Sequence, residues 1–216
     1  MTKKLSGYKH IIWDWNGTLL DDAWLCVEVM NGMLEKRGLS MVNLDFYRSV
    51  FTFPVRDYYL QLGYDFEKES FEKVGMEFMV LYNQRQKECR LHEEVLSVLE
   101  AFSQQGLGQS ILSAREQNEL ITETIDLGVR KYFTRVYGLD DHYAHGKTDV
   151  GLKLIMDLAF EPSSLLFIGD TMHDAEVARE IGIDCILIPH GHHNEERLRT
   201  CSFPVIANLN ELKSRL

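Results

Sequence analysis

Proline and cysteine are scarce in this chain, and its basic residues are outnumbered by acidic ones. The 216 residues include 4 prolines and 4 cysteines, and the cysteines are scattered, with no C-x-x-C pair. Such cysteines are typical of reduced, packed residues in a cytosolic protein and not of a disulfide framework. The formal net charge is −10, from 23 basic and 33 acidic residues, which argues against sequence-independent binding of nucleic acid or anionic lipid.

Long hydrophobic runs are missing as well. No apolar stretch approaches the roughly 20 residues that span a bilayer, and the basic first ten residues lead into a strand pattern instead of a signal-peptide core. We therefore expect a soluble, cytoplasmic protein with no membrane or nucleic-acid partner. The hydrophobic fraction of 45% and the charged fraction of 26% are ordinary globular values, which exclude a disordered or fibrous chain.

Short apolar, β-prone runs that stop at polar or turn residues recur along the chain. Helical patterns separate the later runs: Val95, Leu99 and Phe102 are spaced i, i+4 and i+7, and a second apolar face includes Leu154 and Leu158. Alternating strands and helices indicate an α/β fold, with a Rossmann-like parallel sheet and helices on both faces. We expect its strands within residues 9–20, 109–114, 133–138, 165–170 and 185–189.

Residues 21–90 have helical stretches but no continuous buried-strand run. Pro54 breaks the region after Phe53, because the residue before a proline avoids the helical basin. One apolar stripe at helical spacing consists of Phe71, Val74, Phe78, Leu81 and Tyr82. The pattern predicts a helical domain of residues 21–90, inserted into a discontinuous core of residues 1–20 and 91–216.

Polar side chains stand where the expected strands end. Asp14, Ser113 and Asp170 each follow an apolar run, and Asp174 comes four residues after Asp170. Function in parallel sheets collects at the carboxyl ends of the strands, so these groups are expected at one rim. Three carboxylates cannot crowd together unpaired at acceptable cost, and Mg²⁺, which prefers oxygen ligands, resolves the conflict.

The remaining polar groups favour a phosphoryl ligand. Lys147 begins a helical segment, and with Ser113 and nearby backbone N–H groups it could hold the oxygens of a phosphoryl group. Asp14 is then a candidate nucleophile that forms an acyl-phosphate while the metal neutralises charge. We expect substrate contacts from Thr18, Ser113, Ala114 and Arg115.

These motifs resemble, in order and spacing, those of the haloacid dehalogenase superfamily. The motifs read Asp14-x-Asn16-Gly17-Thr18, Ser113, Lys147 and Gly169-Asp170-x-x-x-Asp174, and the helical insert is similar to that family's C1-type cap. The resemblance, which points to the branch of phosphoglycolate-phosphatase-like hydrolases, implies an enzyme that hydrolyses a small phosphorylated metabolite. It implies Asp14 as nucleophile, phosphate binding by Ser113 and Lys147, and a Mg²⁺ ion held by Asp14, Asp170, Asp174 and the backbone carbonyl of Asn16.

Asn16 departs from the family pattern. The family's phosphatases usually carry a second aspartate here, which protonates the leaving oxygen and later activates water. General acid–base catalysis is worth ~10²–10⁴-fold, and an amide cannot supply it. Three readings follow: hydrolysis restricted to good leaving groups, including a phosphonate substrate; slower turnover in which another group activates water; or a catalytically silent phospho-ligand-binding protein.

Several side chains near these motifs allow two readings. Arg115 either binds a substrate anion or is a surface arginine at a helix start. Phe53 and Arg56 either touch the leaving group or pack between helices. His142, His145 and His173 lie near the motifs and could replace the missing acid–base group. His190, His192 and His193 form either a transition-metal site or solvated loop positions, and the solvated interpretation is favoured.

Overall fold

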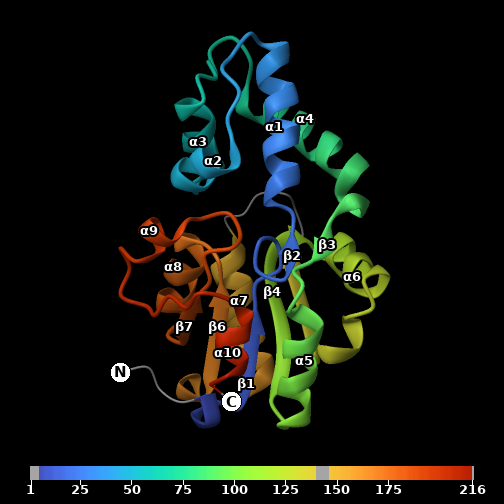
Figure 1. Ribbon diagram of the computed structural model, residues 1–216, viewed down its shortest axis with the longest axis vertical. Helices are drawn as coiled ribbons and strands as arrows, with labels where there is room; N and C mark the ends of the chain where they lie inside the picture. The colour runs from blue at the N-terminus through green and yellow to red at the C-terminus, as the bar shows by residue number, and fades with distance from the viewer. Residues whose placement is uncertain (1–4, 140–145, 216) are drawn as a thin grey trace.

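The computed structural model describes residues 5–139 and 146–215, and its centre is a five-stranded parallel sheet. The strand order is β5-β4-β1-β6-β7, so the first strand of the chain is the middle strand (Figure 1). The predicted α/β class and all five predicted strands are confirmed. The strands are β1 (His10–Trp13), β4 (Gly108–Glu116), β5 (Arg135–Leu139), β6 (Leu165–Gly169) and β7 (Asp184–Leu187).

β1 lies between two parallel neighbours, which explains its uninterrupted apolar sequence. His10 pairs with Gly108 of β4 on one side and with Leu165 of β6 on the other. Ile11, Ile12 and Trp13 are fully buried, as expected for a strand covered on both faces. The side chain of Ile12 belongs to a different apolar cluster from those of Ile11 and Trp13, in keeping with the period of two along a strand.

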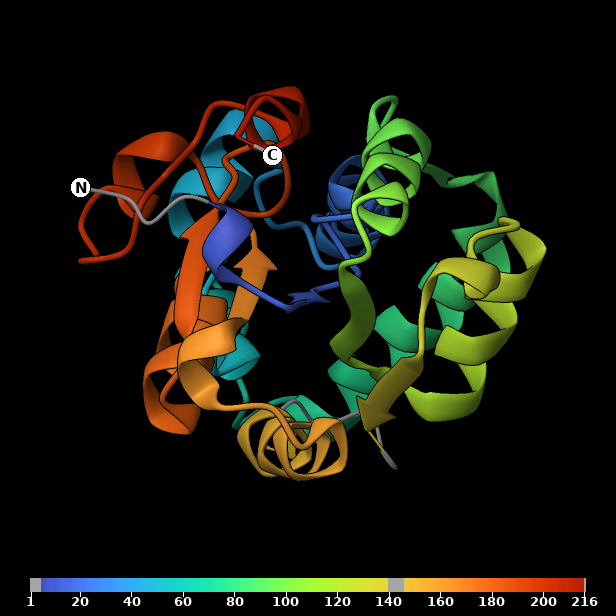
Figure 2. The ribbon, with the colours of Figure 1, turned by 90° about the horizontal axis from the view of Figure 1, so that it is seen from below.

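Helices cover both faces of this sheet. Ile11 and Trp13 pack in one cluster with residues of α5 and α10, whereas Ile12 packs in the other with residues of α7 and α8. Figure 2 shows α7 and α5 on opposite sides of the strands. The helices of this part are α5 (Val95–Gln104), α6 (Gln117–Asp126), α7 (Lys147–Leu158), α8 (Met172–Ile181), α9 (Glu195–Leu198) and α10 (Leu209–Lys213).

Four further helices lie beyond the carboxyl ends of the strands (Figure 1). The chain enters and leaves this layer through a short antiparallel ribbon, in which β2 (Leu20–Asp21) pairs with β3 (Arg90–Leu91). α1 packs directly against α4, and the layer has its own buried residues, including Tyr58 and Val74. The helices are α1 (Ala23–Lys36), α2 (Leu44–Val50), α3 (Val55–Gln61) and α4 (Phe71–Arg85).

Candidate active site

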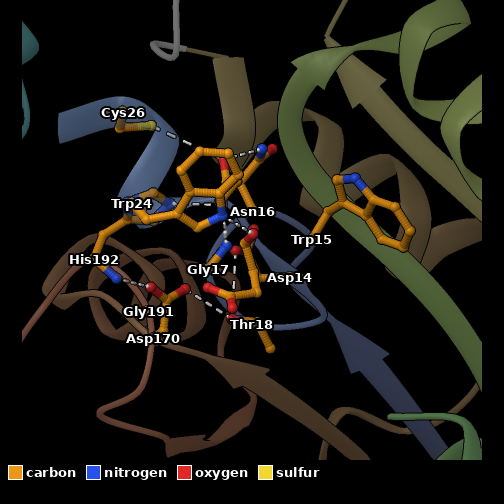
Figure 3. A network of polar contacts seen from close by, with 12 residues as sticks. Asp14, Trp15, Asn16, Gly17, Thr18, Trp24, Cys26, Asp170, Gly191 and His192 are labelled. Carbon is orange, nitrogen blue, oxygen red and sulfur yellow. Dashed lines mark hydrogen bonds and ion pairs between the residues drawn. The ribbon is translucent and has the colours of Figure 1, made fainter. Parts of the chain in front are cut away.

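Three carboxylates meet at the carboxyl end of the sheet. Asp14 directly follows β1, Asp170 directly follows β6, and Asp174 lies in the first turn of α8. Carboxylate oxygens of the three residues lie within 4.8 Å of one another, and all three residues are buried. Because β1 and β6 are parallel neighbours, their ends bring the first two together. Figure 3 shows Asp14 and Asp170 directed toward each other, while Trp15 points away from them.

A capping box fixes the third carboxylate. Thr171 caps α8 by accepting a hydrogen bond from the backbone N–H of Asp174. The Oδ2 atom of Asp174 accepts hydrogen bonds in return from the backbone N–H of Thr171 at 2.9 Å and from its hydroxyl at 2.7 Å. Its other carboxylate oxygen remains directed toward the cluster, where Lys147 contacts it.

Lys147, the first residue of α7, is the cation of this cluster. Its Nζ atom lies 2.5 Å from Oδ1 of Asp14 and 2.6 Å from Oδ1 of Asp174, and its side chain is buried. With Asp170 included, three carboxylates surround one ammonium group, so the fully ionised set carries two net negative charges. That charge and the all-oxygen donor set suit a divalent, hard cation such as Mg²⁺.

Burial and charge shift the pKa values of these groups in opposite directions. Burial raises the pKa of Asp14 well above its ordinary value and raises that of Asp170 to about 6. Burial alone would raise the pKa of Asp174 too, but the ammonium of Lys147 lowers it to about 2. The same carboxylates raise the pKa of Lys147 in spite of its burial, so it carries a charge at neutral pH.

The expected substrate contacts divide into two groups. Ser113 and Ala114 line a cavity that also reaches Asp14 and Lys147. Thr18 is fully buried, is not among the residues that line this cavity, and donates a 2.8 Å hydrogen bond to Asp170. Ser113 was expected at a strand end, but β4 runs on to Glu116 through an irregular register, so Ser113 lies where regular pairing with β5 is interrupted.

Arg115 is neither a surface residue nor free to bind an anion. Its side chain is buried, and its guanidinium lies 2.8 Å from Glu123 and 3.2 Å from Glu119. It also donates hydrogen bonds to the side-chain oxygens of Asn83 and Gln86, which belong to the helical layer. The interpretation of Arg115 as a surface residue is therefore wrong. The side chain that was expected to contact an anion already pairs with residues of both the core and the helical layer.

Asn16 is part of a polar network whose centre the sequence did not indicate. Its Nδ2 atom donates hydrogen bonds to Asp22 at 2.8 Å and to the hydroxyl of Tyr82 at 3.1 Å. Asp22 is buried and also accepts from the backbone N–H of Gly17 and from Tyr82. An aspartate directly before a helix ordinarily reads as a cap, so no local signal marked Asp22 as a residue of the site.

The expectation of solvated loop positions for the histidines after β7 is wrong. His192 and His193 are 7% and 1% exposed, and His190 is half-buried. Nε2 of His192 lies 3.4 Å from Asp22, its Nδ1 lies 2.8 Å from the hydroxyl of Tyr47, and its backbone N–H donates to Asp170. The physical reason is that α2 covers this loop, so its polar groups find protein partners instead of water.

The three histidines after β7 differ in charge. Burial would lower the pKa of His192, but the carboxylate of Asp22 raises it to about 9. Burial lowers the pKa values of His190 and His193 to about 3, so both are neutral at pH 7. Of the remaining histidine candidates, His173 lines the cavity, while His142 and His145 lie outside the described residues.

The cavity above these groups has a volume of about 250 Å³. The core contributes Asp14, Asn16, Lys147 and Asp174 to its wall, and the four helices beyond the sheet contribute most of the remainder. Phe53 lies in this wall, with its ring centroid 4.7 Å from that of His173, so the segment before Pro54 does reach the site. Arg56 is not among the lining residues.

The protein has a Rossmann-like α/β fold, with a parallel sheet, carboxylate side chains at the carboxyl ends of its strands, and a helical layer inserted between β2 and β3. The profile of the haloacid dehalogenase-like hydrolases matches residues 11–188, and the chain belongs to this family. The match confirms the resemblance drawn from the four motifs and, with it, the expected class of enzyme. No helix of the described residues has the length and apolar character needed to cross a membrane.

Two curated relatives and one solved structure illustrate the likeness. An N-acetylmuramic acid 6-phosphate phosphatase from Pseudomonas putida is 26% identical over 197 residues, which cover 87% of this chain and 86% of the relative. A phosphoglycolate phosphatase from Rhodobacter capsulatus is 24% identical over 186 residues, or 84% of each chain. A haloacid dehalogenase-like hydrolase from Streptococcus pneumoniae has the same fold, with a TM-score of 0.81 at 20% identity over 98% of this chain and 100% of that one.

Proposed function

We propose that this protein is a Mg²⁺-dependent phosphatase that hydrolyses a small phosphorylated metabolite through an aspartyl-phosphate at Asp14. The observation that carries the proposal is the buried set of Asp14, Asp170, Asp174 and Lys147, of which Asp14, Asp174 and Lys147 line the cavity. The family and the two phosphatases among its relatives support the same reaction class.

The carboxylates of Asp14, Asp170 and Asp174, with the backbone carbonyl of Asn16, would hold the ion. When bound, Mg²⁺ supplies positive charge that stabilises the negative phosphoryl oxygens. Two net negative charges on the three carboxylates and Lys147 support binding of a divalent ion.

The chain's own residues supply the rest of the chemistry. An oxygen of Asp14 attacks phosphorus in line, and the bond to the leaving oxygen breaks as the new bond forms. The ammonium of Lys147 favours the ionised form of Asp14 against the effect of burial, which raises the pKa of Asp14, and it balances charge on the transferred group. Ser113 and Ala114, on the cavity wall, bind the phosphoryl oxygens. Water then attacks phosphorus, the bond between phosphorus and the Asp14 oxygen breaks, and phosphate leaves as the Asp14 carboxylate is regenerated.

Asn16 restricts the leaving group. Its amide can donate a hydrogen bond but cannot transfer a proton, so esters with good leaving groups are expected to react best. A phosphonate is the alternative substrate class, provided that the departing carbon carries a stabilised negative charge and so needs no proton from residue 16. The second candidate function, favoured by Asn16 alone, is a catalytically silent protein that binds a phospho-ligand.

We propose residues 21–90 as a cap that closes the site over the substrate, and residues 1–20 and 91–216 as the core. The β2–β3 ribbon, where the chain crosses twice between the layers, supports this boundary. A closed cap excludes bulk water during the reaction.

The first test measures phosphate release from an activated aryl phosphate with Mg²⁺ and with EDTA. We expect turnover only with Mg²⁺, and we expect Asp14→Asn to lower it on the order of 10³-fold or more. The control is Asp149→Asn, which removes an exposed carboxylate from the first turn of α7, the helix that begins with Lys147. This variant should keep wild-type turnover. Undiminished turnover by a folded Asp14→Asn protein would contradict the mechanism. Tight phosphate binding without turnover would favour the silent binding protein.

A further inference from the structure

The cavity wall opposite the carboxylates is apolar and largely aromatic. On α4 the lining residues recur at helical spacing, and Glu72 is the charged member of the set: Phe71, Glu72, Gly75, Met76, Phe78, Met79 and Tyr82. The part of the wall formed by α1, α2, α3 and the segment between α2 and α3 includes Met30, Tyr47, Phe51, Phe53, Tyr58 and Tyr59. A leaving group held here would contact rings and thioethers.

The cations of the lining are already paired. Lys147 contacts two carboxylates of the acidic cluster, and Arg115 contacts Glu119 and Glu123 as well as two amide oxygens of the helical layer. The ring of His192 lies 3.4 Å from the carboxylate of Asp22.

The cap contributes one carboxylate to the lining, that of the exposed Glu72. A carboxylate on the leaving group would therefore find no unpaired cation among the described lining residues and would face a like charge. Burying an unpaired charge is costly, so this wall disfavours anionic leaving groups.

The cavity is large enough to hold a ring. An apolar cavity of about 150 Å³ is large enough to hold benzene. The cavity of about 250 Å³ in this protein therefore has room for a phosphoryl group and a single ring.

We propose that the substrate is a phosphate monoester whose leaving group carries one uncharged, apolar ring. The proposal rests on the phosphatase function proposed above. It goes further by assigning the apolar wall of the four helices as the leaving-group site. Phenolic and other ring-stabilised leaving groups also depart without strong protonation, which agrees with the amide at position 16.

The test compares benzyl phosphate, ethyl phosphate and 2-phosphoglycolate. Benzyl and ethyl phosphate both release primary alcohols that are poor leaving groups, so the ring is the main difference between them. One methylene in an apolar pocket changes kcat/KM by roughly 10–200-fold, so we expect kcat/KM for benzyl phosphate to be at least about tenfold higher. 2-Phosphoglycolate, which carries a carboxylate, should be the poorest of the three. Equal values for benzyl and ethyl phosphate, or a preference for 2-phosphoglycolate, would overturn the proposal.

A pocket-filling variant makes the test specific to this wall. A Cβ atom added at Gly75 meets no atom within 4 Å, so Gly75→Leu places a side chain in the cavity without a backbone clash. We expect it to lower the benzyl-to-ethyl ratio about tenfold. Gly32→Leu, at an exposed helical glycine of α1 outside the lining, also meets no atom within 4 Å and should keep the wild-type ratio. An unchanged ratio in Gly75→Leu would count against the assignment.

A binding measurement separates this proposal from the proposed reaction. Benzylphosphonate and methylphosphonate are titrated into the Mg²⁺-loaded protein by calorimetry. We expect benzylphosphonate to bind at least about tenfold more tightly, and Gly75→Leu to remove the difference. If no phosphate ester is hydrolysed, the proposed phosphatase function is wrong. The ratio of the two phosphonate affinities then tests by itself whether the apolar wall binds a ring. Equal affinities would then reject it.

Discussion

The amide of Asn16 and the carboxylate of Asp22 form a matched pair of donor and acceptor, 2.8 Å apart, inside the site. An aspartate at position 16 would bring a second carboxylate against Asp22. Two carboxylates at that distance cannot both be ionised without a large cost. The amide at position 16 therefore suits the buried carboxylate of Asp22, and a change to aspartate at position 16 alone is expected to lower the stability of the protein.

We predict that Asn16→Asp lowers the free energy of unfolding by about 1–3 kcal/mol at pH 7. Asp22→Asn should also destabilise the protein, because His192 loses its carboxylate partner. The double variant again places one carboxylate opposite one amide, so its destabilisation should be smaller than the sum of the two. Urea unfolding of the four proteins measures the coupling, expected at roughly 0.5–3 kcal/mol for contacting residues. Simple additivity would show that the two side chains are not coupled.

The carboxylate cluster was predictable residue by residue, whereas its surroundings were not. Asp14 and Asp170 end buried runs, and Asp174 follows at helical spacing, so local pattern and sheet geometry suffice to place them. Asp22 and His192 are far apart in the sequence and come into contact only in the folded protein. No periodicity or spacing connects these two residues in the sequence.

At the scale of elements, α2 is bound to the loop that follows β7. Arg48 donates hydrogen bonds of 2.7 Å and 2.8 Å to the carbonyl oxygens of His190 and Gly191. Arg197, in α9, donates in the other direction to the carbonyl oxygen of Phe51. These contacts hold the helical layer against the core beside the cavity.

With the helical layer acting as the proposed cap, we predict that Arg48→Ala lowers kcat/KM for phosphate release by up to about 30-fold, because the loss of two hydrogen bonds at roughly 1 kcal/mol each weakens closure. Arg56→Ala is the matched control. Its guanidinium lies over the ring of Phe66 within the same layer, and it should retain the wild-type value. Steady-state kinetics on one aryl phosphate compares the three proteins. Equal losses in both variants would point to general destabilisation of the layer, and no loss in Arg48→Ala would exclude a role in closure.

The order of strands and helices followed from the sequence because each element depends on its own periodicity. The predictions that were wrong at this scale concern residues that lie where two elements meet. Ser113 lies at an irregularity of β4 that pairing with β5 produces, and Arg115 is buried because α4 and α6 enclose it with acidic and amide partners. A pattern within one element does not reveal its neighbours.

For the molecule as a whole, buried histidines couple stability to pH. His10 in β1 is 2% exposed, contacts the ring of Phe160, and shares a 2.8 Å hydrogen bond with the hydroxyl of Ser110. Burial, aided by the charge of Arg135, lowers its pKa to about 4 from an ordinary value of 6.5. Between those values the unfolded chain binds a proton that the folded protein does not, so stability is complete above pH 6.5 and falls as the pH approaches 4.

We predict that His10→Gln flattens this dependence. The free energy of unfolding of the wild type should fall more steeply between pH 6 and pH 4.5 than that of the variant, by up to about 1.4 kcal/mol per pH unit for one proton. Above pH 7 the two slopes should coincide, because the histidine is neutral in both the folded and the unfolded state. Urea unfolding at several pH values gives both slopes. Parallel slopes across the acidic range would assign the pH dependence to other groups.

The sequence by itself determined the parallel α/β sheet, the family, the helical insert and the three carboxylates with Lys147. These features depend on residues close in the chain, or on the rule that parallel strands end at the same edge. Only the tertiary structure decided the burial of Arg115, the pairing of Asp22 with His192 and the apolar wall above the carboxylates. Each of these arises where the helical layer packs on the core, and the relative position of two packed layers is set by many weak contacts that no local sequence pattern records.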